Sequence, residues 1–150
     1  MIRDDITAAL TAAMKAGEKP RVATIRLIQS ALKNRDIELR GKPPVADDDA
    51  LVTEVLQKMV KQRRESITMY ETGNRPELAA AEAAEIDVIE AFLPRQLGDE
   101  ELAAAVDAAV ADTGASSPKD MGKVMAALKS AHAGTIDMSK VGPLVKARLG

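Results

Sequence analysis

The chain has 150 residues, which suits one domain or two small ones and allows a buried hydrophobic core. Its net charge of −2 and its pI of about 5.5 argue against a strongly basic nucleic-acid binder and leave room only for a local basic patch. Because the chain contains no cysteine, disulfides, thiolate metal sites and cysteine nucleophiles are excluded.

Aromatic residues are nearly absent, since Tyr70 and Phe92 are the only two. Single-stranded nucleic-acid binders usually stack bases on aromatic side chains, so the composition argues against that mode. No apolar run approaches the roughly 18 residues of a membrane span. The first ten residues also lack the pattern of a signal peptide. We therefore expect a bacterial, cytoplasmic protein that does not bind membranes.

The first two helices are predicted by apolar spacing and by glycine and proline stops. Residues 3–16 carry apolar positions four apart, and Gly17 is placed as a C-terminal cap. Pro20 fits the first turn of the second helix, which Gly41 closes. The apolar positions are Ile6, Leu10 and Met14, then Val22, Ile25, Ile28 and Leu32.

Two further helices complete a predicted antiparallel bundle of about four helices. Asp47-Asp48-Asp49 opens a long helix, where acidic side chains suit the positive end of the macrodipole, and Gly73 ends it. Asn74 is predicted to cap the fourth helix, which runs to Leu93 and is stopped by Pro94. The connections are short, as in a bundle.

After residue 95 the helices become short, and the sequence predicts a small C-terminal three-helix domain. The predicted domains are residues 1–95 and 96–150, and the fold class is all-α because no segment alternates like a strand. Gly114 ends the first short helix, and Asp137 is a candidate N-cap for the last one.

Charges along the second helix form the densest cationic stretch of the chain. Residues 1–46 hold nine basic and five acidic residues, a net charge of +4. The cations concerned are Arg21, Arg26, Lys33, Arg35 and Arg40. A solvated helix face explains them most simply.

Motifs for catalysis or metal binding are missing from the sequence, which has no dinucleotide loop, no phosphate loop and no HExxH. The single histidine, His132, lies near a helix end and has no acidic cluster at metal-ligand spacing, so we expect no cofactor and no metal. Arg63 interrupts an apolar stripe, and Glu85 or Glu82 is predicted to be its partly buried partner. Methionines on apolar stripes are predicted core filler: Met14, Met59, Met121 and Met125.

The stretch SSPKDMGKVMAALK, residues 116–129, begins like a well-capped helix. Ser117 can cap it, Pro118 suits its first position, and Asp120 can close a capping box. Gly122 costs a helix interior roughly 0.8–1 kcal/mol relative to alanine. Two explanations stay open, namely close packing of a neighbouring helix and close approach of a ligand's backbone.

Three segments with matching order and spacing give the chain a family resemblance. They are QKMVKQRRES at residues 57–66, FLPRQL at residues 92–97 and KDMGKVM at residues 119–125. The chain closely resembles the GatB/YqeY family over nearly its whole length. The resemblance implies a helical bundle followed by a three-helix domain, similar to the tail of the B subunit of tRNA-dependent amidotransferase, which helps to hold tRNA.

The resemblance also suggests which residues meet RNA. Lys119, Gly122 and Lys123 match the family's signature, and Gly134 and Asp137 match a following turn. The remaining candidates for phosphate contacts are Lys129, Lys140 and Lys146. Two positions depart from the pattern: Ile136 replaces a small residue, and Gly142-Pro143 lies inside the last helix, where proline should kink or restart it.

Three functions compete at this point. The first is a non-catalytic tRNA-binding module linked to tRNA-dependent amidotransfer. The second is an adaptor that docks on an amidotransferase or an aminoacyl-tRNA synthetase. The third is an enzyme, a carbon–nitrogen ligase with glutamine as amido-N-donor, which the family label would imply. The sequence offers no nucleophile with a base and no nucleotide loop, so it favours the first two.

Overall fold

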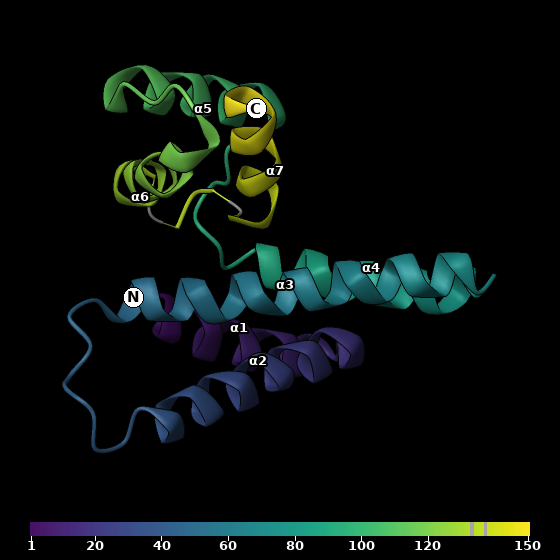
Figure 1. Ribbon diagram of the computed structural model, residues 1–150. Helices are drawn as coiled ribbons and strands as arrows, with labels where there is room; N and C mark the ends of the chain where they lie inside the picture. The colour runs from purple at the N-terminus through teal and green to yellow at the C-terminus, as the bar shows by residue number, and fades with distance from the viewer. Residues whose placement is uncertain (133, 137) are drawn as a thin grey trace. The chain divides into compact units, whose positions relative to one another are not determined.

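The computed structural model describes residues 1–132, 134–136 and 138–150, and all regular structure among them is helical, which confirms the all-α prediction. Its elements are α1 (Ile2–Ala16), α2 (Lys19–Glu38), α3 (Asp48–Thr72), α4 (Pro76–Glu90), α5 (Asp99–Thr113), the 3₁₀ turn η1 (Pro118–Asp120), α6 (Met121–Ala131) and α7 (Met138–Leu149) (Figure 1). None of the described helices is both long enough and apolar enough to cross a membrane.

The chain divides into two compact units, Met1–Leu93 and Pro94–Gly150. The first contains α1 to α4 and the second contains α5 to α7 with η1. Each unit has its own cluster of buried apolar side chains. That residues 1–95 and 96–150 are independent folding domains stays a prediction.

The N-terminal unit is built around the long helix α3, which lies side by side with α4 (Figure 1). Ile25, Ile28, Leu56 and Ile89 are fully buried where α2, α3 and α4 meet. Burying such a side chain contributes roughly 1.5–3 kcal/mol, so this shared core holds the unit together.

Two glycines end helices as the sequence predicted. Gly17 takes the left-handed conformation at the end of α1, with φ 71°, and its N–H reaches the carbonyls of the last turn. Gly73 caps α3. Gly41, however, lies beyond the end of α2, because Leu39 is the last residue with helical geometry and Gly41 turns the chain with φ 78°.

The predicted cap of α4 is wrong. Asn74 does not cap α4 but adopts φ 57° directly after α3, and Arg75 holds the cap position. The Arg75 N–H donates to the Tyr70 carbonyl at 2.7 Å and closes the turn that follows α3. Asn74 lies inside this turn, so it belongs to the end of α3. Asparagine tolerates the left-handed region better than most residues, which explains this use.

The end of α4 also differs from the prediction. The helix stops at Glu90, and the chain to Leu93 tightens into turns in which the Phe92 N–H donates to the Ile89 carbonyl at 3.1 Å. The residue before a proline disfavours helical geometry, so Pro94 helps to end the helix before its own position.

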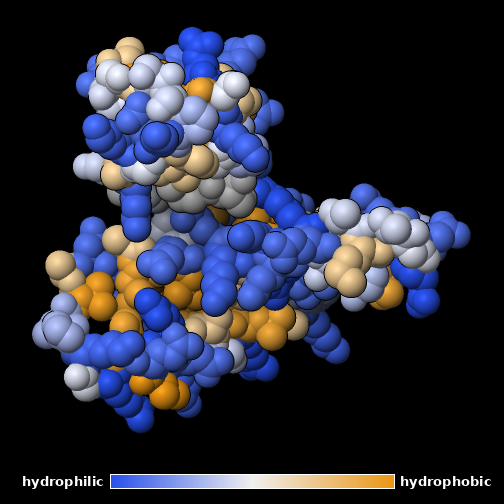
Figure 2. Space-filling view, viewed as in Figure 1, coloured by the Kyte–Doolittle hydropathy of each residue, from blue (hydrophilic) through white to orange (hydrophobic). Residues whose placement is uncertain are grey.

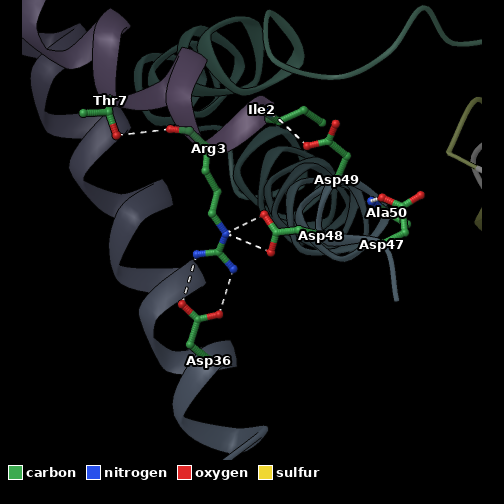
Figure 3. A network of polar contacts seen from close by, with 8 residues as sticks. All are labelled: Ile2, Arg3, Thr7, Asp36, Asp47, Asp48, Asp49 and Ala50. Carbon is green, nitrogen blue, oxygen red and sulfur yellow. Dashed lines mark hydrogen bonds and ion pairs between the residues drawn. The ribbon is translucent and has the colours of Figure 1, made fainter. Parts of the chain in front are cut away.

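One arginine ties three helices of the N-terminal unit together (Figure 3). The guanidinium of Arg3 on α1 donates to both oxygens of Asp36 on α2, at 3.0 and 2.8 Å, and its Nε donates to Asp48 on α3. Next to it, the Ile2 N–H donates to Asp49 at 2.9 Å. The acidic start of α3 therefore receives contacts from α1 in addition to interacting with its own helix dipole.

The predicted partner of Arg63 is confirmed as Glu85. The Arg63 Nε lies 2.8 Å from a Glu85 oxygen, and a second guanidinium nitrogen donates to the Met59 carbonyl at 3.2 Å. The Arg63 side chain is only 14% exposed. Burial of this guanidinium depends on the carboxylate of α4, because an unpaired buried charge is strongly unfavourable.

The N-terminal unit exposes several apolar side chains beside charged ones (Figure 2). Met14 is one of them, with 54% of its surface exposed, so its predicted place in the core is wrong. Ala13 is buried instead, one position earlier on α1. Met59 is buried as predicted, and Met121 and Met125 pack against the C-terminal core.

The C-terminal unit packs α5, α6 and α7 around Leu102, Val106, Val124, Leu128, Ile136, Val141 and Val145. The segment that enters this unit is fixed by hydrogen bonds. The Gln96 side-chain amide donates to the Gly134 carbonyl at 2.7 Å, and the Leu97 N–H donates to the Thr135 carbonyl at 2.8 Å. Gln96 and Leu97 are therefore part of the unit.

Candidate nucleic-acid interface

The start of α6 is held by Asp120, although not in the way predicted. Ser117 has the extended geometry of a cap, but it forms no side-chain capping bond, and Pro118 opens the 3₁₀ turn η1. The Asp120 carboxylate accepts the Ser116 N–H at 3.0 Å. This bond holds the pKa of Asp120 below its usual value, with smaller contributions from the Ser117 N–H and from Lys123.

The side chains of α6 separate into a buried and an open face. Val124 and Leu128 are buried in the core of the unit, and Met121 and Met125 pack beside them. With 3.6 residues per turn, Gly122 and Ala126 lie on the side away from Val124. Both are exposed.

Three lysines border this open face. Lys123 lies along one edge, Lys129 lies on the same side of the helix as Gly122 about two turns later, and Lys119 precedes them in η1. All three are exposed, and none forms an ion pair with an acidic side chain in the described ranges. The first turn of α6 itself holds no acidic residue, but the carboxylate of Asp120, which caps the helix, interacts with Lys123 and offsets part of the positive charge there.

Gly122 is not there to let another helix approach. A Cβ atom built on Gly122 would have no heavy atom of another residue within 4 Å, apart from its chain neighbours and the backbone of its own helix. Within the C-terminal unit, the interpretation in which a neighbouring helix packs closely against this glycine is therefore wrong. The approach of a ligand from outside is the explanation that stays open.

The last helix, α7, carries two exposed lysines and continues without a break. Lys140 and Lys146 are exposed on α7, whereas Arg148 pairs with Asp107 at 2.8 Å. The helix runs through Pro143, so the predicted restart at this proline is wrong. Gly142 before it has no Cβ to clash with the proline ring, which lets the helix continue.

The turn before α7 contains a glycine in the left-handed conformation and a buried isoleucine. Gly134 has φ 78°, a conformation that favours glycine, and its carbonyl accepts the Gln96 amide. Ile136 is 3% exposed and belongs to the core, so the departure from the family pattern at this position does not alter the surface. The candidate N-cap Asp137 lies outside the described residues.

The structure thus brings Lys119, Gly122, Lys123 and Lys129 together on one segment, and it places Lys140 and Lys146 on the adjoining α7. His132 ends α6, and its carbonyl accepts both the N–H and the hydroxyl of Thr135 at 3.0 Å. No group of His, Asp or Glu suited to a metal ion occurs within the described part of the chain.

Gln96 is the residue that sequence reasoning missed, because its role depends on a carbonyl 38 positions away. It fixes Gly134 and so the turn between α6 and α7. The only available signal was that Gln96 stands inside the shared FLPRQL segment.

Comparison with known proteins identifies relatives over most of the chain. The family model described as "Yqey-like protein" matches residues 3–149. Altered inheritance of mitochondria protein 41, mitochondrial, of Saccharomyces cerevisiae is 32% identical over 84 residues, 56% of this chain and 44% of that protein. The protein of the same name from Eremothecium gossypii is 35% identical over 101 residues, 66% of this chain and 54% of that protein.

The chain spans about half the length of these curated relatives. Their names place those proteins in mitochondria and state no activity. The expectation of a bacterial, cytoplasmic protein stays a prediction.

Proposed function

We propose that this chain, which belongs to the Yqey-like protein family, is a non-catalytic tRNA-binding module linked to tRNA-dependent amidotransfer. Its C-terminal unit would hold the phosphate backbone of tRNA through Lys119, Lys123, Lys129, Lys140 and Lys146. The observation that supports this proposal is the open face of α6.

That face has the features a phosphate backbone requires. Gly122 and Ala126 form a low strip, Lys123 stands beside it and Lys129 stands at its C-terminal end, and neither lysine forms an ion pair among the described residues. A backbone lying on the strip would meet one lysine beside it and another at its end, without displacing a bulky side chain. Lysine binds phosphate as a point charge, so this contact would read shape and charge rather than base sequence.

A binding titration with whole tRNA tests the proposal. The variant Lys119→Gln/Lys123→Gln/Lys129→Gln is expected to bind tRNA at least tenfold more weakly than the unmodified chain at low salt. Lys15→Gln/Lys58→Gln/Lys61→Gln is the matched control, because it removes three exposed lysines from the other unit. Equal affinities of the two triple variants would contradict the proposal.

A groove between α2 and α3 favours a second candidate, the protein–protein adaptor. This groove has a volume of about 340 Å³, and its apolar floor of Ala31, Val55 and Met59 lies between charged residues. An amidotransferase or an aminoacyl-tRNA synthetase could dock there. Recovery of such an enzyme by the purified chain, abolished by Val55→Glu while tRNA binding is retained, would support the adaptor.

A further inference from the structure

The basic residues of the α2 region fall into two groups. Arg21 pairs with Glu18 at 3.9 Å, and Arg35 pairs with Glu38 at 3.0 Å. Three of the remaining cations, Arg26, Lys33 and Arg40, are exposed and form no ion pair within the part of the chain that the structure describes. We call these three residues the α2 cation row.

The members of the row are seven positions apart. On an α-helix that spacing is nearly two whole turns, about 10.5 Å along the axis, so Arg26 and Lys33 lie on the same side of α2. Arg40 follows in the turn after the helix, where its N–H donates to the Ile37 carbonyl at 3.1 Å. The row therefore follows the length of α2 and extends past its end.

One acidic residue of α2 would be expected to neutralise the row. Asp36 stands three positions after Lys33, a spacing at which helix side chains are neighbours, and it precedes Arg40, which lies in the turn after the helix. Figure 3 shows that Asp36 is directed to Arg3 of α1 instead, and the guanidinium occupies both of its oxygens. Arg3 thereby engages Asp36, and no ion pair joins Asp36 to Lys33 or Arg40 in the described part of the chain.

We propose that the α2 cation row is a second RNA contact, which binds phosphates of the same tRNA independently of the lysines of the C-terminal unit. The inference rests on the proposed function and adds a surface to it. Three unpaired, regularly spaced cations suit a chain of phosphates, the dominant source of affinity in nucleic-acid binding.

An anionic membrane is a poorer match for this helix. A helix that lies in a lipid surface inserts a continuous apolar face. The apolar face of α2 is already committed, because Ile25, Ile28 and Leu32 are buried in the core of the N-terminal unit. Two large apolar side chains of α2, Leu27 and Ile37, stay 46% and 44% exposed, but they are ten positions apart and give no continuous apolar face for lipid.

The first test measures tRNA binding by the full chain over a range of salt concentrations. Arg26→Gln/Lys33→Gln/Arg40→Gln is expected to lower the slope of log affinity against log salt by about 2–3, since each phosphate contact contributes roughly 0.7–0.9. The matched control is Arg21→Gln/Arg35→Gln, which removes ion-paired cations of the same region and is expected to leave the slope unchanged.

A second test addresses the engagement of Asp36 by Arg3. Arg3→Gln frees Asp36 to neutralise a member of the row, and it is expected to lower the slope by about 1, equivalent to one phosphate contact. Arg3→Gln/Asp36→Asn removes the freed charge and is expected to restore the slope. A purely structural role for Arg3 would leave the double variant as impaired as the single one.

The outcomes separate this inference from the proposed function. If the α6 triple variant loses affinity and the row variant keeps its slope, the row inference is overturned and the proposed function stands. If only the row variant loses affinity, the row stands and the C-terminal interface is overturned. Failure of the unmodified chain to bind tRNA, with row-dependent binding to phosphatidylserine vesicles, would overturn both.

Discussion

Replacing Gly122 by alanine is expected to stabilise the protein and to weaken its binding to RNA. The added Cβ would meet no atom within 4 Å, so it brings no steric penalty. Alanine also loses less conformational freedom than glycine when a helix forms, which contributes about 0.5–1 kcal/mol. For a unit of this size, 1 kcal/mol corresponds to a rise in Tm of about 4–8 °C.

Two measurements are needed for this variant. Thermal unfolding followed by circular dichroism gives the change in Tm, and hydrogen exchange of the α6 amides assigns that change to the C-terminal unit. A tRNA titration is expected to show at least a fivefold loss of affinity, because forcing a methyl group into a close contact typically costs about 1–3 kcal/mol. A loss of stability in Gly122→Ala would refute the reasoning.

Gly142 offers a matched control in the next helix. A Cβ on Gly142 would also have no neighbour within 4 Å, yet Pro143 follows it. Because a Cβ before proline clashes with the proline ring in helical geometry, Gly142→Ala is expected to give no gain in Tm. If Gly122→Ala and Gly142→Ala raise Tm equally, the clash with the Pro143 ring does not determine stability, and the reasoning is contradicted.

Two further predictions concern the ion pairs of the N-terminal unit. Glu85→Leu should lower the free energy of unfolding by about 1–2 kcal/mol in urea titrations, since it leaves Arg63 partly buried and unpaired. The double change with Arg63→Met should recover most of that loss, and no recovery would contradict the account. Arg3→Met should lower the free energy of unfolding by about 1 kcal/mol at pH 7, because it removes an exposed bidentate network. Its hydrogen bonds hold the pKa of Asp36 below its usual 3.8, so this contribution is present above that pH and is lost as the pH falls through the lowered pKa. A difference between the two proteins that does not shrink as the pH falls below 3.8 would contradict it.

Local rules explain why the helices could be predicted from the sequence. Glycine in the left-handed conformation ends α1 and α5, at Gly17 and Gly114, because few other residues adopt it without strain. The same rule also explains the error at Asn74. Asparagine is both a good N-cap and a good left-handed residue, and the sequence alone does not decide which use prevails.

The candidate site depended on information that short-range patterns do not carry. The exposure of Lys119 and Lys123 follows from apolar spacing along α6, and it was predictable. The empty space around Gly122 was not, since it depends on where other helices lie. The same holds for Asp36, whose partner Arg3 is 33 positions away and on another helix.

The salt dependence of tRNA binding tests the central claim most directly. Affinity would be measured between 50 and 200 mM salt for the unmodified chain and for a variant with glutamine at all five interface lysines. If each lysine meets one phosphate, the slope of log affinity against log salt should fall by about 3.5–4.5 in the variant. An unchanged slope, or no binding of tRNA by the unmodified chain at low salt, would contradict the account.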